Sequence, residues 1–97
     1  MAYIGKIKVT DTWTSVESMI SSQIGSFTFG DSTYQLQSEG PVGVRLANAS
    51  AVPEDADDGE RINNTQVAFY TKDGGTLYAR TEEGKNFVWL KISELSE

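Results

Sequence analysis

The residues best suited to chemistry in this 97-residue chain are the carboxylates of one short segment. Residues 53–61 read PEDADDGER and place five acidic side chains in seven consecutive positions. We name this segment the acidic loop. Clustered carboxylates are compatible with a calcium site, an acid–base catalytic pair or a solvated connection between strands.

A calcium loop of the EF-hand type needs oxygen ligands at positions 1, 3, 5 and 12 and a glycine at position 6. With Gly59 at position 6, position 3 is Ala56 and position 12 is Thr65, so two ligand positions of the pattern fail. Zinc and iron sites are disfavoured because the chain has no histidine and no cysteine. A looser calcium site would use Asp55, Asp57 and Asp58, but we expect no bound metal.

Acid–base catalysis needs a carboxyl group whose pKa is raised by an apolar, dehydrated environment. The acidic loop is the most polar part of the chain, so its side chains are expected to be hydrated. Nucleophile pairs built on histidine or cysteine are impossible, and no glycine-rich phosphate loop is found. The sequence therefore predicts no catalytic residue, no cofactor and no enzyme activity.

The acidic loop is consequently interpreted as a solvated loop between two strands. Pro53 is expected to end the preceding strand, and Gly59 to supply a backbone angle that other residues resist. Arg61 or Arg45 is expected to pair with one of the acids. Such an exposed pair contributes about 0–1 kcal/mol.

Net charge is concentrated in the same loop. The chain has 14 acidic and 8 basic residues, and removing the five acids of the loop leaves 9 acids against 8 bases. The loop repels phosphate groups and no basic stripe offsets it, so we expect no nucleic-acid partner. No apolar run is long enough to cross a membrane, and the N-terminus lacks the pattern of a secretion signal.

The elements that position these residues are predicted within a single domain, residues 1–97. Residues 1–12 form an N-terminal arm or strand, because apolar and polar residues alternate over 3–9. A helix is predicted over 13–24, with a cap at Asp11, Thr12 or Thr14 and a stop at Gly25. Its apolar face consists of Trp13, Val16, Ile20 and Ile24.

Residues 26–92 are predicted to form an antiparallel β body, followed by a tail over 93–97. Short strands are expected at 26–29, 33–37, 42–46, 66–71, 76–80 and 86–92, with turn signals about every 8–12 residues. Asp73 and Gly74 between two strand patterns predict a hairpin. The predicted fold is mainly β: an antiparallel β-sandwich or small barrel of six to seven short strands, with one N-terminal α-helix covering an open end.

The last predicted strand is apolar on both faces. Val88, Leu90 and Ile92 point one way, while Phe87 and Trp89 point the other way together with a lysine. Trp89 therefore completes the core, lies at an oligomer interface or forms a ligand platform. The candidate interface residues are Phe87, Trp89, Tyr78 and Tyr3.

The runs TYQLQSEGPVGVRLANASAVPEDADDGERI, AFYTKDGGTLYAR and VWLKISEL lie within residues 33–95. This succession resembles small β-sandwich modules of tailed-bacteriophage virions, which occur in head-decoration, head-fibre and tail-fibre proteins. The resemblance implies a non-enzymatic structural protein, often a homotrimer, that is attached to a capsid or tail. It also implies synthesis in the bacterial cytoplasm and a final location in the virion.

Two functions therefore stay open. The first is a virion accessory protein that oligomerises and docks on other virion proteins. The second is a carbohydrate-binding or host-receptor-binding module of a phage fibre. The second is suggested by aromatic residues in the predicted strands, namely Tyr34, Tyr70, Tyr78 and Trp89, which would stack on a glycan.

Overall fold

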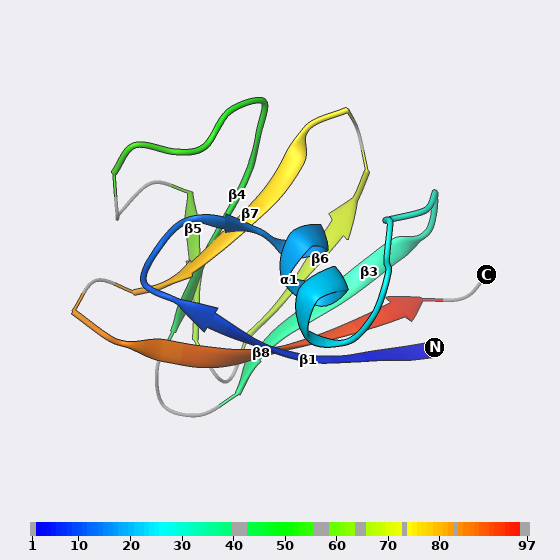
Figure 1. Cartoon of the computed structure of the whole chain (residues 1–97), viewed down its shortest axis with the longest axis horizontal. Coiled ribbons are helices and arrows are strands. Elements are labelled where there is room, and N and C mark those ends of the chain that lie inside the picture. Colours follow the sequence, from blue (N-terminus) through cyan, green and yellow to red (C-terminus); the bar gives the residue numbers. More distant parts are fainter. Residues whose placement is uncertain are drawn as a thin grey trace.

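The chain forms a sandwich of two four-stranded antiparallel sheets with one short helix (Figure 1). This computed structural model describes residues 2–39, 43–55, 59–63, 66–72, 74–82 and 84–95. The prediction of a mainly β, antiparallel sandwich with an N-terminal helix is confirmed. The described residues form eight strands where six to seven were predicted, because two very short strands, at 14–15 and 60–62, lie at the sheet edges.

The two sheets are built from strands that are far apart in sequence. Sheet A has the order β1-β8-β3-β6 and sheet B the order β2-β7-β4-β5. The strands of sheet A are β1 (Ala2–Thr10), β8 (Phe87–Leu95), β3 (Thr33–Glu39) and β6 (Val67–Thr71). Those of sheet B are β2 (Thr14–Ser15), β7 (Thr76–Thr81), β4 (Val44–Ala49) and β5 (Glu60–Ile62). The helix α1 spans Val16–Gln23.

The core lies between the sheets and follows from strict alternation along the strands. In β8, Val88, Leu90 and Ile92 are buried while their neighbours Phe87 and Trp89 are exposed. Each fully buried branched side chain of this kind stabilises the fold by roughly 1.5–3 kcal/mol. The inner faces of the other strands complete the core, mainly through Ile7, Val9, Leu36, Val44, Leu46, Leu77 and Ala79.

The helix begins three residues later than predicted. Thr14 and Ser15 are extended and pair with β7, so residues 13–15 of the predicted helix lie outside it. Ser15 is the N-cap, and its hydroxyl accepts a hydrogen bond from the backbone N–H of Ser18 at 3.3 Å. The cap is therefore none of the three residues proposed from the sequence.

The buried face of α1 also differs from the predicted one. Val16, Met19 and Ile20 are buried, whereas Ile24 is 48% exposed. The helix ends just before Gly25, where the N–H groups of Ile24 and Gly25 both donate to the carbonyl of Ile20. Helix α1 packs against β1, β2 and β7, so it covers the β1/β2 edge of the sandwich, in agreement with its predicted covering role.

Residues 26–30 are not a strand, which corrects the strand predicted at 26–29. Their backbone is held by side chains of α1: the Glu17 carboxylate accepts from the N–H of Phe29 at 2.7 Å, and the Ser21 hydroxyl bonds to Phe27. Phe29 is buried and its ring centroid lies 4.8 Å from that of Tyr34. The alternating phenylalanines therefore reflect anchoring of a loop rather than sheet pairing.

The predicted hairpin around Gly74 is wrong. Strand β6 pairs with β3 in sheet A, whereas β7 pairs with β2 and β4 in sheet B. The turn therefore carries the chain from one sheet to the other, and Asp73 itself lies outside the described residues. Strand β8 also continues through Leu95, so most of the predicted tail at 93–97 belongs to sheet A.

Candidate functional site

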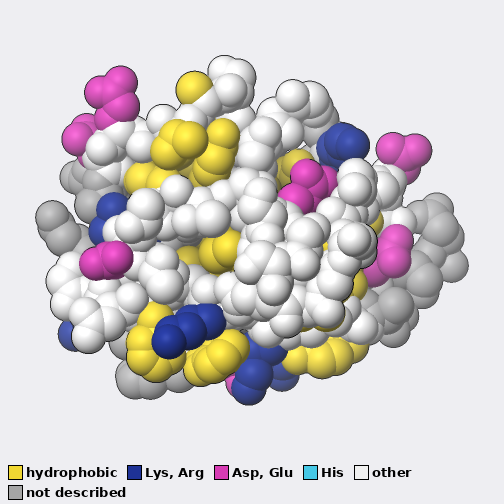
Figure 2. Space-filling model, viewed as in Figure 1, with side chains coloured by type: hydrophobic (Ala, Val, Ile, Leu, Met, Phe, Trp, Pro, Cys, Tyr) yellow, Lys and Arg dark blue, Asp and Glu magenta, His cyan; other side chains and the backbone are white. Residues whose placement is uncertain are grey.

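The outer face of sheet A carries aromatic and basic side chains next to each other. We define the basic–aromatic face as Lys6 and Lys8 of β1 with Phe87, Trp89 and Lys91 of β8. These residues point outward because the alternate residues of both strands are buried in the core. In Figure 2 hydrophobic and basic side chains lie together along the lower rim, where β1 and β8 run in Figure 1.

Pairing of β1 with β8 brings these residues into contact. Lys8 lies opposite Trp89 in the antiparallel register, and Lys6 lies opposite Lys91. The ammonium of Lys6 is 5.2 Å from the Trp89 ring centroid, and that of Lys8 is 4.6 Å from the Phe87 centroid. Each such cation–π contact contributes about 0.5–1 kcal/mol at an exposed site.

Contacts among the side chains of this face include a ring pair, an ion pair and two opposed lysines. The rings of Phe87 and Trp89 meet edge to face, with centroids 6.4 Å apart and planes at 86°. Lys91 forms an ion pair with Glu39 of the neighbouring strand β3, at 3.9 Å. Opposing Lys6 and Lys91 on one face costs stability, because like charges directly opposite each other in a sheet repel. A bound anionic partner would remove that cost.

The structure places three of the four predicted interface residues on this outer face. Phe87 is 43% exposed and Trp89 is 38% exposed, so the interpretation of Trp89 as a core residue is wrong. Tyr3 is exposed and opposite Ser93, further along the same face. Tyr78 lies on β7 and faces outward from sheet B, on the opposite side of the sandwich.

The basic members of the face were not recognised as a group from the sequence. The outward alternation of Lys6 and Lys8 was visible, and Lys91 shares the face of Phe87 and Trp89. What was missing was the pairing of the first strand with the last. That pairing creates a local basic surface on a chain whose net charge is −6.

The acidic loop is solvated where the structure describes it. Glu54 and Asp55 are exposed, and the Trp13 indole N–H donates to the carbonyl oxygen of Asp55 at 2.8 Å. Gly59 has a φ of 76°, as predicted. Ala56, Asp57 and Asp58 lie outside the described residues. Within the described ranges, no group of three or more potential ligand side chains is close enough to hold a metal ion.

Two features of the loop were predicted incorrectly. The preceding strand ends at Ala49 rather than at Pro53, and Glu60 belongs to β5 rather than to a loop. Arg61 forms an ion pair with Glu82, at 3.3 Å.

Glu82 joins the ends of two strands of sheet B. Its carboxylate accepts a hydrogen bond from the N–H of Gly43, directly before β4, and contacts Arg61 of β5. The Gly43 hydrogen bond lowers the pKa of Glu82, and Arg61 and Lys85 lower it further, while partial burial opposes the change. The Glu82 carboxylate therefore ties the start of β4 to β5 at the edge of sheet B.

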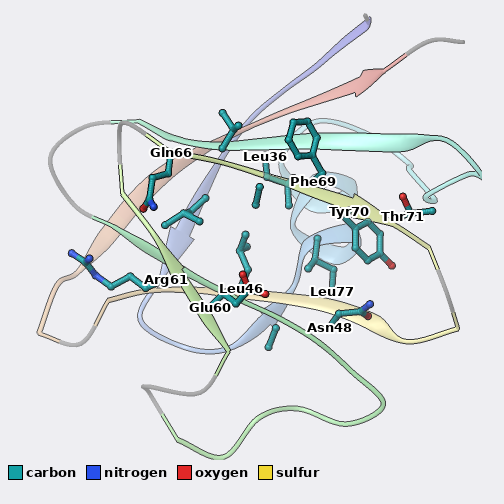
Figure 3. Close-up of a pocket in the computed structure, with 14 residues that line it drawn as sticks. Leu36, Leu46, Asn48, Glu60, Arg61, Gln66, Phe69, Tyr70, Thr71 and Leu77 are labelled. Atoms are coloured by element: carbon teal, nitrogen blue, oxygen red, sulfur yellow. The ribbon is translucent and has the colours of Figure 1, made fainter.

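A pocket of about 740 Å³ opens between the sheets at the edge formed by β5 and β6 (Figure 3). Its floor includes Leu36, Leu46 and Leu77, which point into the gap between the sheets. Phe69 of β6 points away from this gap, toward the outer face of sheet A. The rim of the pocket is polar, with Asn48, Glu60, Arg61 and Gln66 among the described residues that line it.

No match to this chain was found among protein-family models, curated proteins or solved structures. Over the described ranges, no helix combines the length and apolar character needed to cross a lipid bilayer. The function therefore has to be argued from the surface of the molecule itself.

Proposed function

We propose that this protein is a non-enzymatic structural module that acts by binding other proteins through its basic–aromatic face. The observation that carries this proposal is the exposure of Phe87 and Trp89 beside three lysines on the outer face of sheet A. Aromatic residues are enriched in protein interfaces, and a few of them supply most of the binding energy. An acidic partner surface fits the excess of positive charge on this face.

The more specific form of the proposal is an accessory protein of a tailed-phage virion. It rests on the resemblance of residues 33–95 to capsid-decoration, head-fibre and tail-fibre modules, and on the sandwich fold. In this form the protein oligomerises and docks on capsid or tail proteins of the virion. The same resemblance favours a homotrimer.

The test compares the wild-type protein with Trp89→Ser, using Tyr78→Ser as a control on the opposite sheet. Light scattering measures the assembly mass, and thermal denaturation checks that the fold is retained. We expect Trp89→Ser to reduce assembly or partner binding while the melting temperature changes little, because the ring is partly exposed. If the wild-type protein stays monomeric at high concentration, self-assembly is refuted. Docking on a different protein is then the one form of the proposal that survives.

The second candidate is a carbohydrate-binding or host-receptor-binding module. The exposed rings of Phe87 and Trp89 favour it, because flat aromatic faces stack on sugars. However, an ammonium group already lies over one face of each ring and competes with such stacking. Binding to a glycan array that is lost in Trp89→Ser, together with monomeric behaviour, would favour this candidate over assembly.

A further inference from the structure

The four edge strands of the sandwich differ in how they are protected. An edge strand exposes unpaired backbone groups, and natural proteins block such edges with short length, charge or bulges. Strand β2 has two residues, and β5 has three, two of them charged. Strand β1 carries two outward lysines and an irregular register between Tyr3 and Gly5. Three of the four edges are therefore protected.

Strand β6 has none of these protections. Its five residues, VAFYT, include no charged residue and no proline, and they pair in unbroken register with β3. Val67 is exposed and Phe69 is 60% exposed on the outer face of sheet A. Among the residues that the structure describes, no strand pairs with the other edge of β6, and β5 and β6 together frame the open side of the pocket (Figure 3). Such an edge is a template for another strand.

We propose that β6 pairs with β6 of a second copy, antiparallel and across a two-fold axis. The two A sheets then join into one sheet of eight strands. A two-fold axis through Phe69 places Val67 opposite Thr71 of the second copy, and Ala68 opposite Tyr70. This contact is separate from the basic–aromatic face and gives a dimer, so it goes beyond the proposed function.

The sequence of β6 is self-complementary in this register, which points to a second copy. Val67 and Thr71 form a β-branched pair, and Ala68 opposite Tyr70 combines a small with a large inward side chain. Tyr70 stays in its own core, because its ring centroid lies 4.8 Å from that of Phe29. The next pair along the strand places Lys72 opposite a glutamine, so no like charges oppose each other.

The net charge of the chain predicts how this contact responds to salt. Each copy carries a net charge of −6, so two copies repel each other at long range while the β6 edges themselves are uncharged. Added salt screens this repulsion and should tighten the dimer. Docking of lysines on an acidic surface has the opposite dependence, because salt weakens that attraction.

A single cysteine reports the proposed register, because the chain contains no cysteine of its own. Residues directly opposite in an antiparallel pair have Cβ atoms about 4.5–5.5 Å apart, close to the disulfide range. Phe69→Cys is therefore expected to form a disulfide-linked dimer rapidly under mild oxidation. Gln35→Cys is the matched control: Gln35 lies beside Phe69 on the same outer face, but on the interior strand β3. Equal rates of cross-linking in the two variants would overturn the proposal.

Light scattering over a concentration series tests the same contact without cross-linking. In the Trp89→Ser background, where the proposed contact through the basic–aromatic face is weakened, we expect a mass of two chains and a dissociation constant raised about tenfold or more by Phe69→Lys. The melting temperature should be unchanged by Phe69→Lys at concentrations where the chains are monomeric, because dimer formation itself stabilises the folded chain. A monomer at the highest concentration, or a trimer insensitive to Phe69→Lys, overturns the proposal. An assembly dispersed by Trp89→Ser but not by Phe69→Lys also overturns it, while leaving the proposed function intact.

Discussion

The role of α1 in closing the sandwich can be tested by truncating Ile20 to alanine. Ile20 is 1% exposed and lies on the face of the helix that packs against the sheets. The change removes three carbon atoms, which at about 0.8 kcal/mol for each buried methylene costs about 2.4 kcal/mol. The cavity left behind adds to this, so we expect a loss in the upper part of the range of about 2–5 kcal/mol.

The assay is urea and thermal denaturation, followed by circular dichroism. For a domain of this size, 1 kcal/mol shifts the melting temperature by about 4–8 °C, so a fall of about 10 °C or more is expected. Ile24→Ala is the matched control, because Ile24 caps the same helix but is exposed. It should cost less than about 1 kcal/mol. Equal losses in the two variants would show that α1 does not dock on its own sheets.

Three further predictions concern the acidic loop and its surroundings. Gly59→Ala should cost about 1–3 kcal/mol in urea denaturation, because φ is positive and the new Cβ would collide with the Leu46 carbonyl oxygen. Glu82→Gln should lower the urea midpoint at pH 7. Because the fold lowers the pKa of Glu82 below 4.5, this contribution is complete above pH 4.5 and is lost as the pH falls through the folded-state value. Millimolar calcium should leave the melting temperature unchanged, because the ligand spacing of the loop fails.

Each of these predictions has a clear contrary result. Gly74 also has a positive φ but open space around it, so an equal loss in Gly74→Ala would contradict the close contact at Gly59. If the difference in urea midpoint between wild type and Glu82→Gln widened below pH 4.5, the stabilising role of the carboxylate would be contradicted. A calcium ion at 100 times its dissociation constant stabilises by about 2.7 kcal/mol, so a rise of several degrees would overturn the solvated-loop interpretation.

Alternation along single strands was enough to predict the fold class and most of sheets A and B. The strands around Leu36, Leu46, Leu77 and Leu90 all show the expected pattern of buried and exposed residues. Strand β5 was missed because it is three residues long and contains a single buried side chain, Ile62. So short a strand exists only because β4 provides its partner.

Local sequence patterns do not determine which strands pair with each other. The turn at Gly74 signals a change of direction but does not show whether the flanking strands enter the same sheet. For the candidate site, the pattern of β8 predicted that Phe87 and Trp89 share one face of the strand but left open whether that face is buried. Their lysine partners come from β1, about eighty residues earlier in the chain, and only the tertiary structure brings them together.

The position of β8 between β1 and β3 has a consequence for synthesis on the ribosome. Both neighbours of β8 in sheet A emerge before it, and β1 has no other strand partner in that sheet. During translation the first strand must therefore wait, unpaired, until the residues around Leu90 have left the ribosome. Closing contacts so distant in sequence is slow. A nascent chain that stops before Phe87 cannot complete sheet A and would expose its apolar inner face to proteases and chaperones.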